Sequence, residues 1–402
     1  MSPTLVLGAS LAYLLALFAV AWWADRRAGQ GRSVIGNAWV YALSMAVYCT
    51  AWTYFGSIGR AASGGVWFLP IYLGPMLAMV GAWLVLRKMV RIARRFRITS
   101  IADFIASRYG KSRLLAGLVT LIALVGVVPY VALQLKAVAS GYAVLTGQPQ
   151  AGQAGSGTAL LVALLLAGFT IAFGTRHLDN TERHEGMVAA VAAESVVKLV
   201  AFLAVGAFVT WGLFGGLGDL FGQALARPEL ARVLQPAAGG FAFDAWFALT
   251  ALAMLSVILL PRQFQVMVVE NVDERHIRRA AWVFPAYLLG INLFVLPIAM
   301  GGQVLGVANP ETYVLSLPLA AGAQGLALLA FVGGLSAATG MVIVEAIAVS
   351  TMVCNDLVLP LLLRAKALAQ RDLTGLILAV RRLVIVALLL LGWAYFRIAG
   401  DA

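Results

Sequence analysis

The feature that most constrains this chain is a succession of long apolar segments that runs through its 402 residues. Each has about the 20 residues that a helix needs to cross a hydrocarbon core of about 30 Å. Only 11% of the residues are charged and the mean hydropathy is +0.93, whereas about a quarter of a soluble domain is charged. The sequence therefore predicts an all-α polytopic membrane protein. Ten segments can be marked, at approximately 4–24, 36–57, 65–90, 113–145, 157–175, 187–213, 241–262, 280–304, 321–353 and 376–398.

Lysine and arginine are concentrated in alternate loops between these segments. The largest group lies between Arg87 and Arg113, and other groups lie within residues 26–32, 262–279 and 364–382. Because basic loops stay on the cytoplasmic side, the pattern predicts an external N-terminus. The arginines of residues 87–113 alternate with apolar residues, which predicts a helix lying on the membrane surface. The net charge of +12 then indicates membrane lipids as partners and not nucleic acid.

The ends and reactive residues of the chain add little chemistry. The first segment has no basic stretch before it and no small-residue cleavage site, so we expect a retained helix. The cysteines, Cys49 and Cys354, give no disulfide framework. No catalytic residue, no cofactor and no histidine–cysteine metal site are expected. The three histidines fall in predicted loops, at His177, His184 and His276.

Two apolar segments combine hydroxyl side chains with glycines. Segment 36–57 contains Thr50 and Thr53 near two glycines, and we expect this helix to be interrupted, although an ordinary packing helix is the simpler alternative. Segment 321–353 gathers glycines, Ser and Thr between Gly333 and Gly340. Small residues let membrane helices approach closely, so this run is either a packing seam or part of a binding site.

Ionisable residues inside apolar segments are costly and indicate function or pairing. Glu194 and Lys198 lie four residues apart on one helical face, so they form either a structural ion pair or a functional pair. Glu345 is placed about opposite Ser336 on its helix, which favours a structural role or a role in a cytoplasmic gate. Pro261 is expected to end or kink segment 241–262.

The segments repeat with a similar spacing. A breakable segment is followed two segments later by a long one, first in residues 36–213 and again in residues 241–402. The two blocks are five segments apart and are therefore inverted, as in secondary transporters whose binding site lies between repeats. We expect one transporter-like domain over residues 1–402, with an extra helix at 4–24.

The chain resembles the sodium:solute symporter family, and it is most similar to the transporter-like membrane domain of CbrA-type sensor histidine kinases. The resemblance implies a LeuT-type core of five plus five helices with an extra N-terminal helix. It also implies that the chain stops before the tenth core helix. The residues that carry it are Trp52 with 56–59, Tyr130 with Gln134, the run 260–271, and 333–336.

The family binds a sodium ion between the first and eighth core helices. The resemblance implies an ion-site remnant made of backbone oxygens from Ala46, Cys49 and Gly333 and of the Ser336 hydroxyl. The next position is Ala337, where symporters carry a hydroxyl, so the remnant lacks one ligand. Either a weakened sodium site or proton coupling is then expected.

Lys198 lies on the fifth core helix, and the resemblance implies that this helix passes near the ion site. Its ammonium could replace the charge of sodium, which makes Lys198 and Glu194 the coupling candidates. A carboxylated solute would suit the start of a half-helix at the break. The candidate substrate contacts are Thr50, Thr53, Tyr54, Tyr130 and Gln134.

Three functions follow from this resemblance. The favoured one is a module that imports an amino acid, histidine above others, and acts as the input domain of a two-component sensor histidine kinase. Its kinase would lie C-terminal to residue 402 and its partner would be the cognate response regulator. The alternatives are a free-standing sodium- or proton-coupled symporter and a solute receptor that does not transport.

Overall fold

A computed structural model describes residues 1–148, 153–174, 184–235, 242–363 and 374–399. Every regular element in these ranges is a helix. Six helices are long and apolar enough to cross a membrane, and the number rises to eight if each of two bent helix pairs counts as one span. The chain is therefore an all-α multi-pass membrane protein, as its hydropathy predicts.

The helices follow one another along the chain without long connections. The first part contains α1 (Pro3–Gly29), α2 (Ala38–Ser44), η1 (Met45–Tyr48), η2 (Trp52–Gly56), α3 (Ser57–Gly64), η3 (Gly65–Phe68), α4 (Pro70–Val80), α5 (Val85–Phe96), α6 (Ile101–Arg108), α7 (Arg113–Thr146), α8 (Gln153–Gly174), α9 (Glu185–Ala207) and η4 (Phe208–Leu213). The second part contains α10 (Leu217–Leu225), α11 (Pro228–Leu234), α12 (Phe243–Leu259), α13 (Pro261–Phe264), η6 (Gln265–Val269), α14 (His276–Asn292), α15 (Val295–Val304), η7 (Pro310–Thr312), α16 (Tyr313–Ala320), α17 (Gln324–Met352), η8 (Val353–Val358), α18 (Leu359–Leu362) and α20 (Thr374–Ala399).

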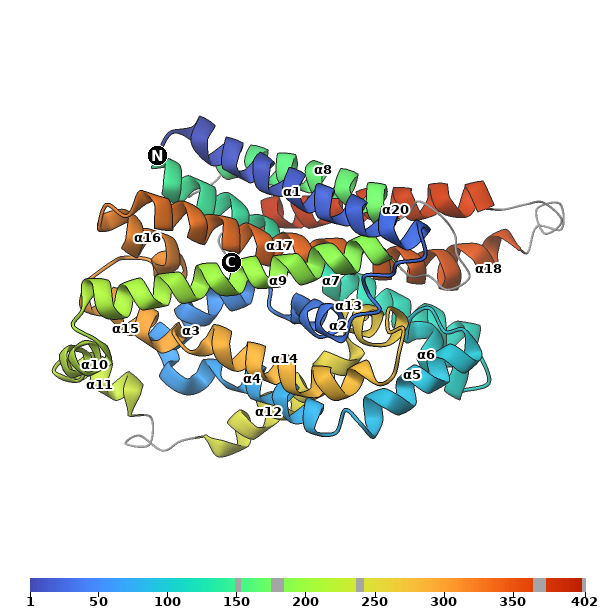
Figure 1. Ribbon diagram of the computed structural model, residues 1–402, viewed down its shortest axis with the longest axis horizontal. Coiled ribbons are helices and arrows are strands. Elements are labelled where there is room, and N and C mark those ends of the chain that lie inside the picture. The colour runs from blue at the N-terminus through green and yellow to red at the C-terminus, as the bar shows by residue number, and fades with distance from the viewer. Residues whose placement is uncertain (149–152, 175–183, 236–241, 364–373, 400–402) are drawn as a thin grey trace.

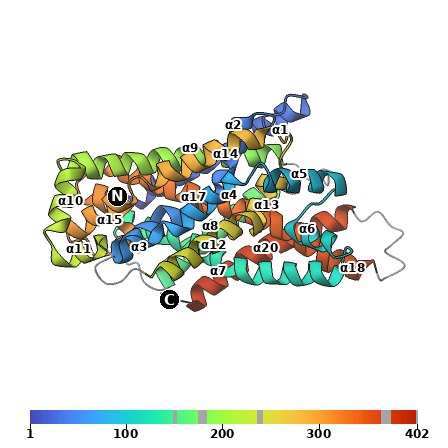
Figure 2. The same cartoon turned by 90° about the horizontal axis from the view of Figure 1, so that it is seen from below.

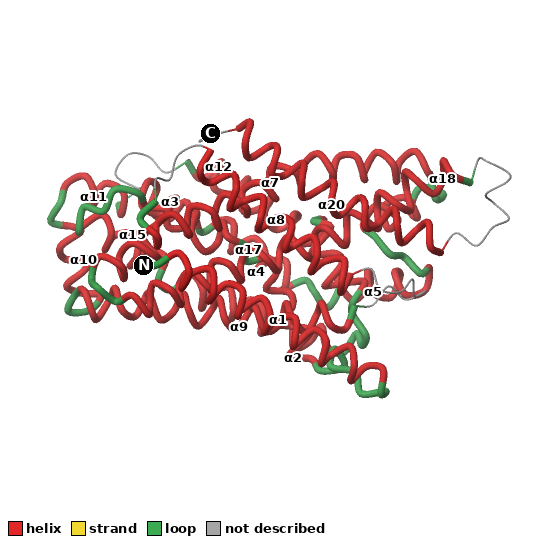
Figure 3. The backbone as a smooth tube through the Cα atoms, turned by 90° about the horizontal axis from the view of Figure 1, so that it is seen from above, coloured by secondary structure: helices red, strands yellow, loops and turns green. Residues whose placement is uncertain are grey.

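Helix α17 is the central element of the bundle. In its most apolar stretch 83% of the residues are buried, against 17% for α1. It packs against α9, α7, α8, α16 and α20, while α1 lies along α9 on the outside (Figures 1 and 3). The ends of the bundle are distinct, with α5, α6 and α18 at one and α10 and α11 at the other (Figure 2). These are called the α5–α6 end and the α10–α11 end below.

Two of the predicted segments are interrupted where the sequence indicates. The helix of segment 36–57 stops at Tyr48 and resumes at Trp52, so the expected interruption is confirmed. Helix α12 ends at Leu259, and α13 starts at Pro261 with an axis that differs by 53°. The expected effect of this proline is therefore also confirmed, since its ring cannot continue the preceding helix.

The basic stretch after the third segment differs in detail from the prediction. Segment 65–90 extends too far, because α4 ends at Val80 and a turn precedes α5. The single surface helix predicted over residues 87–113 is two helices, α5 and α6, separated by Arg97 at φ 52°. The left-handed conformation at Arg97 ends α5, which sequence periodicity alone does not show.

Gly74 allows α4 and α12 to pack closely. A Cβ atom at this position would lie 2.5 Å from both the Met254 nitrogen and the Thr250 oxygen, which are backbone atoms that cannot rotate away. We expect Gly74→Ala to lower the melting temperature, because overpacking costs about 1–3 kcal/mol. Gly168→Ala in α8 is the matched control, since nothing lies within 4 Å of its Cβ position. Equal melting temperatures for the two variants in thermal unfolding would contradict the close approach.

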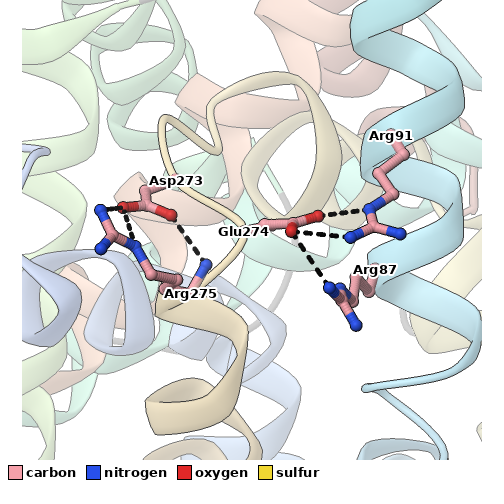
Figure 4. Close-up of polar contacts among 5 residues, drawn as sticks. All are labelled: Arg87, Arg91, Asp273, Glu274 and Arg275. Carbon is pink, nitrogen blue, oxygen red and sulfur yellow. Dashed lines mark hydrogen bonds and ion pairs between the residues drawn. The ribbon is translucent and has the colours of Figure 1, made fainter.

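An ionic clamp holds α5 against the loop before α14 at the α5–α6 end. Glu274 accepts from Arg91 Nε at 2.6 Å and from Arg87 Nη2 at 3.2 Å, and the neighbouring Asp273 pairs with Arg275 (Figure 4). Hydrogen bonds from Arg91 and Arg87 lower the pKa of Glu274 from 4.5 to about 2. The clamp is exposed to solvent, so salt weakens it.

The depressed pKa of Glu274 predicts how the clamp responds to acid. A carboxyl whose pKa falls on folding stabilises the fold above its unfolded value, and this contribution is lost as the pH drops from about 4.5 to 2. Glu274→Gln should therefore speed amide hydrogen exchange in α5 at pH 7, relative to α7 in the same sample. Wild type should show the same increase only below about pH 4. An unchanged exchange rate in the variant would show that apolar packing alone holds α5.

The two histidines that the structure describes lie at different places and have different surroundings. His184 Nδ1 lies 2.8 Å from Glu270 Oε1 just before α9, and His276 begins α14. His177 lies outside the described residues.

Candidate functional site

The centre of the site is the interruption between η1 and η2. Cys49 is extended, with φ −80° and ψ 98°, so the hydrogen-bonding pattern of the first half-helix stops there. The Ala46 carbonyl accepts from the Cys49 N–H at 3.0 Å, but other carbonyl groups at the end of α2–η1 and the first N–H groups of η2 are left without helical partners. Buried backbone groups of this kind need other partners, which makes the break a binding position for charged and polar side chains.

Lys198 of α9 reaches the first half-helix. Its ammonium donates to the carbonyl oxygens of Ala46 and Cys49, both at 2.9 Å, and only 1% of the side chain is exposed. These carbonyls lie at the C-terminal end of α2–η1, where the helix dipole favours a positive charge. A lysine ammonium therefore occupies two of the oxygens named for the ion-site remnant.

The second half-helix is held by α7. The Gln134 Oε1 atom accepts from the backbone N–H of Ala51 at 2.9 Å, and the Tyr130 hydroxyl lies 2.9 Å from Thr50 Oγ1. Both side chains project from one turn of α7. The break is thus fixed by α9 on its carbonyl side and by α7 on its N–H side.

The small residues of α17 face α9 at the same level. Ser336 donates to the Glu194 carbonyl at 2.9 Å, and Thr339 donates to Glu194 Oε1 at 2.6 Å. A Cβ at Gly340 would clash with Glu194 Oε2, so a larger residue at this position would force the carboxyl to move. The Glu194 carboxyl thus accepts from α17, whereas the Lys198 ammonium donates to α2–η1 and the break. Residues 333–340 therefore pack closely against α9 and also supply the polar contacts around Glu194.

A second buried charge pair joins α13 to α17. Arg262 Nη1 donates to Glu345 Oε2 at 2.8 Å, and both side chains are at most 3% exposed. The guanidinium also lies 4.9 Å from the centre of the Tyr130 ring, within cation–π distance. Ser336 and Glu345 thus face different helices, α9 and α13, as their spacing along α17 predicts.

Two cavities approach the break from opposite ends of the bundle. The apolar cavity has a volume of about 570 Å³ and reaches α6, where Ile101 and Ile105 line it. The charged cavity, of about 500 Å³, is lined by Lys136 and Glu311 and reaches the segment before α16. Trp52 lines both. Along the described chain, the second half of the broken helix therefore separates two chambers.

Solved structures contain the same arrangement of helices. A Na⁺-coupled sialic acid symporter in a substrate-bound outward-open state superposes with a TM-score of 0.71 at 15% identity, over 97% of this chain and 81% of that one. The fold is that of LeuT-type symporters. It supplies the broken helix and the central α17 that the contacts describe. The chain matches no known family model.

Two sequence relatives point in the same direction. The uncharacterized symporter YhjB of Bacillus subtilis is 26% identical over 264 residues, which are 65% of this chain and 50% of that protein. The uncharacterized symporter YodF of the same organism is 34% identical over 104 residues, which are 26% of this chain and 21% of that one. The chain thus spans about half the length of the first relative that it matches and less of the second.

The structure brings only some of the predicted residues together. Thr53 and Tyr130 line the apolar cavity, whereas Gln134 and Thr50 hold the break itself. Tyr54 is fully buried away from both cavities and packs against Phe55, Phe202 and the surface of Gly333. A substrate in either cavity would not reach Tyr54 without a change of conformation.

The ion-site residues fit an ammonium group better than a sodium ion. The oxygens of Ala46 and Cys49 accept from Lys198, and the Ser336 hydroxyl donates to Glu194. Ala337 adds no oxygen. A sodium ion needs several free oxygens, and two of the four named oxygens already accept from the Lys198 ammonium.

Sequence reasoning missed the pairing of Arg262 with Glu345 and the position of Trp52 between two cavities. The charge pattern places Arg262 in the basic loop of residues 262–279, whereas the structure buries its side chain, with 3% exposure, against Glu345. The signal for a buried partner is that this arginine directly follows a helix-breaking proline at the end of an apolar segment. No comparable signal marks Trp52, because the cavities arise from the packing of α6, α7 and α16.

Proposed function

We propose that this chain is the membrane module of a secondary transporter that moves a small solute past the broken helix. The observation that supports it is the pair of cavities that approach Trp52 from opposite ends of a LeuT-type fold. Alternating access needs two such approaches separated by a thin barrier. A rearrangement of η2 and α3 against α7 would connect the solute to one chamber at a time.

The coupling ion that we propose is the proton, carried by Lys198. Its ammonium joins α9 to the carbonyl end of α2–η1 by two hydrogen bonds. Loss of the proton would remove the charge that the half-helix dipole attracts and would weaken this joint. Glu194 lies one helical turn away and is held by Thr339, so it is our candidate for the group that exchanges protons with Lys198.

For the solute and its biological context, the proposal rests on resemblance. An amino acid is favoured, with histidine first, and import into a bacterial cell across its inner membrane with the N-terminus outside. The resemblance of run 260–271 to CbrA-type proteins supports a role as input domain of a sensor histidine kinase. The names of the two relatives favour a free-standing symporter instead. The division into inverted blocks 36–213 and 241–402 stays a prediction.

Uptake into proteoliposomes tests the proposal. Radiolabelled histidine and leucine would be offered under a proton gradient, under a sodium gradient and under neither. We expect accumulation with the proton gradient, and Lys198→Met should abolish that response. Binding without accumulation under any gradient would favour a receptor. Accumulation that follows sodium alone would overturn proton coupling and leave the transporter proposal intact.

A further inference from the structure

The apolar cavity contains one charged group in an otherwise uncharged wall. Of the described residues that line it, only Arg262 carries a charge. Its neighbours are mostly aliphatic, among them Ile71, Ile101, Val119 and Ile122. A cavity of about 570 Å³ is within the range of small-molecule sites, in which a few polar groups fix the orientation of an apolar ligand.

The Arg262 guanidinium has hydrogen-bonding capacity to spare. One of its terminal nitrogens, Nη1, donates to Glu345, while the buried Nε has no hydrogen-bond partner among the described residues. Glu345 Oε1 is likewise buried without one. A carboxylate in the cavity could accept from the guanidinium nitrogens that Glu345 does not use. The planar guanidinium matches a carboxylate in particular, which accepts two parallel hydrogen bonds.

The charge of the site limits the ligand further. Arg262 and Glu345 together are neutral, and the other groups that interact with the guanidinium are the hydroxyls of Tyr130 and Tyr48 and the more distant Lys198. One arginine already shared with a glutamate can accept a single extra negative charge more readily than two, since buried charge without a partner is costly. A monocarboxylate fits, and a phosphate dianion does not.

We propose that the apolar cavity binds a small monocarboxylate with an apolar body, with its carboxylate on Arg262 and its body against the isoleucines near α6. This rests on the proposed transport function and deepens it by naming the solute class, in which an apolar carboxylate replaces the histidine that the resemblance favours. Glu345 competes with the ligand for the guanidinium. Ligands of this class include apolar amino acids and plain aliphatic acids. They differ from histidine because they have no polar ring.

Equilibrium binding to the full chain in lipid nanodiscs tests this inference. The probes are leucine, 4-methylpentanoate, which has the same body without the α-ammonium group, histidine, and the uncharged 4-methylpentanamide. We expect leucine or 4-methylpentanoate to bind, and whichever binds identifies the source of the carboxylate. The amide should not bind, and histidine should bind at least about tenfold more weakly than the better apolar probe.

Two variants test whether Arg262 binds the carboxylate or serves only in a structural ion pair with Glu345. Glu345→Gln removes the competing charge and should tighten carboxylate binding by about tenfold. The double variant Arg262→Gln with Glu345→Gln removes both charges without leaving one unpaired, and it should lose carboxylate binding. Equal binding in all three proteins, binding of the amide by wild type, or binding of none of the probes would overturn the inference.

The outcomes also separate this inference from the proposed function. Carboxylate binding that depends on Arg262 without uptake in proteoliposomes would refute transport and keep the site. Uptake of an amino acid that persists in the double variant would keep transport and refute the site.

Discussion

Removing the Lys198 ammonium and restoring a hydroxyl at position 337 should create a sodium response in this protein. In Lys198→Ala with Ala337→Ser, the carbonyls of Ala46 and Cys49 lose their cation, and a new oxygen appears beside Ser336. Buried carbonyls at the negative end of a half-helix then attract another cation. Sodium at about one hundred times its dissociation constant would stabilise the fold by about 2.7 kcal/mol. We expect a melting temperature a few degrees higher in sodium chloride than in choline chloride.

The matched control is Lys198→Met. Its side chain is of similar length and fills the same space, so it removes the charge without opening room for an ion. This variant should be destabilised, because two buried carbonyls lose their partners at about 1–3 kcal/mol each, and it should not respond to sodium. A wild-type protein that gains as much from sodium as the Ala–Ser variant would show that Lys198 does not occupy the ion position.

The second large effect concerns the Arg262–Glu345 pair. Breaking a buried ion pair from one side leaves an uncompensated charge and costs about 3–5 kcal/mol, while removing both charges can be neutral. Arg262→Gln alone should therefore melt well below wild type, Glu345→Gln less so because its amide oxygen can still accept from Nη1, and the double variant should recover most of the loss.

Unfolding can be followed with a thiol-reactive dye, since the thiols of Cys49 and Cys354 are both buried in the folded chain. The coupling energy from the four proteins should be positive and of the order of 2–3 kcal/mol. Additive effects of the two substitutions would mean that the 2.8 Å contact contributes nothing to the free energy of unfolding. The assignment of Arg262 to a buried ion pair that also binds the ligand would then be wrong.

Much of the framework could be predicted from the sequence. The hydropathy gives the helices, and the hydroxyls and glycines near Thr50 give the interruption, because both are local properties of the chain. The proximity of Lys198 to the half-helix came through resemblance, and its role stays a proposal. The contacts of Arg262 and Trp52 depend on how distant helices pack. Arg262 contacts Glu345 only because the chain changes direction at Leu260, between α12 and α13. A hydrophobic pattern does not predict the direction of such a bend.

The division of a basic stretch into α5 and α6 shows a second limit. Periodicity identified the amphipathic character of residues 87–113, but the single left-handed residue Arg97 decides where one helix ends. Arginine is not a usual residue for that conformation, in which glycine or asparagine is common. The signal in the sequence lies just beyond Arg97, where Ser100 and Asp103 have the spacing of a helix N-cap, and Ser100 caps α6 by accepting from the Asp103 N–H at 3.0 Å.

Helix α17 is one continuous helix that contacts both buried charged groups, the first around Glu194 and Lys198 and the second formed by Arg262 and Glu345. Thr339 and Ser336 contact the Glu194 side of α9, and Glu345 contacts Arg262 nine residues beyond Ser336, roughly 13 Å along the axis. A shift of this helix that loosens one of these groups must disturb the other. If protons act at the first and solute at the second, linkage requires each to change the affinity of the other by the same factor. Proton affinity measured with and without bound solute would then report the coupling energy of the transport cycle directly.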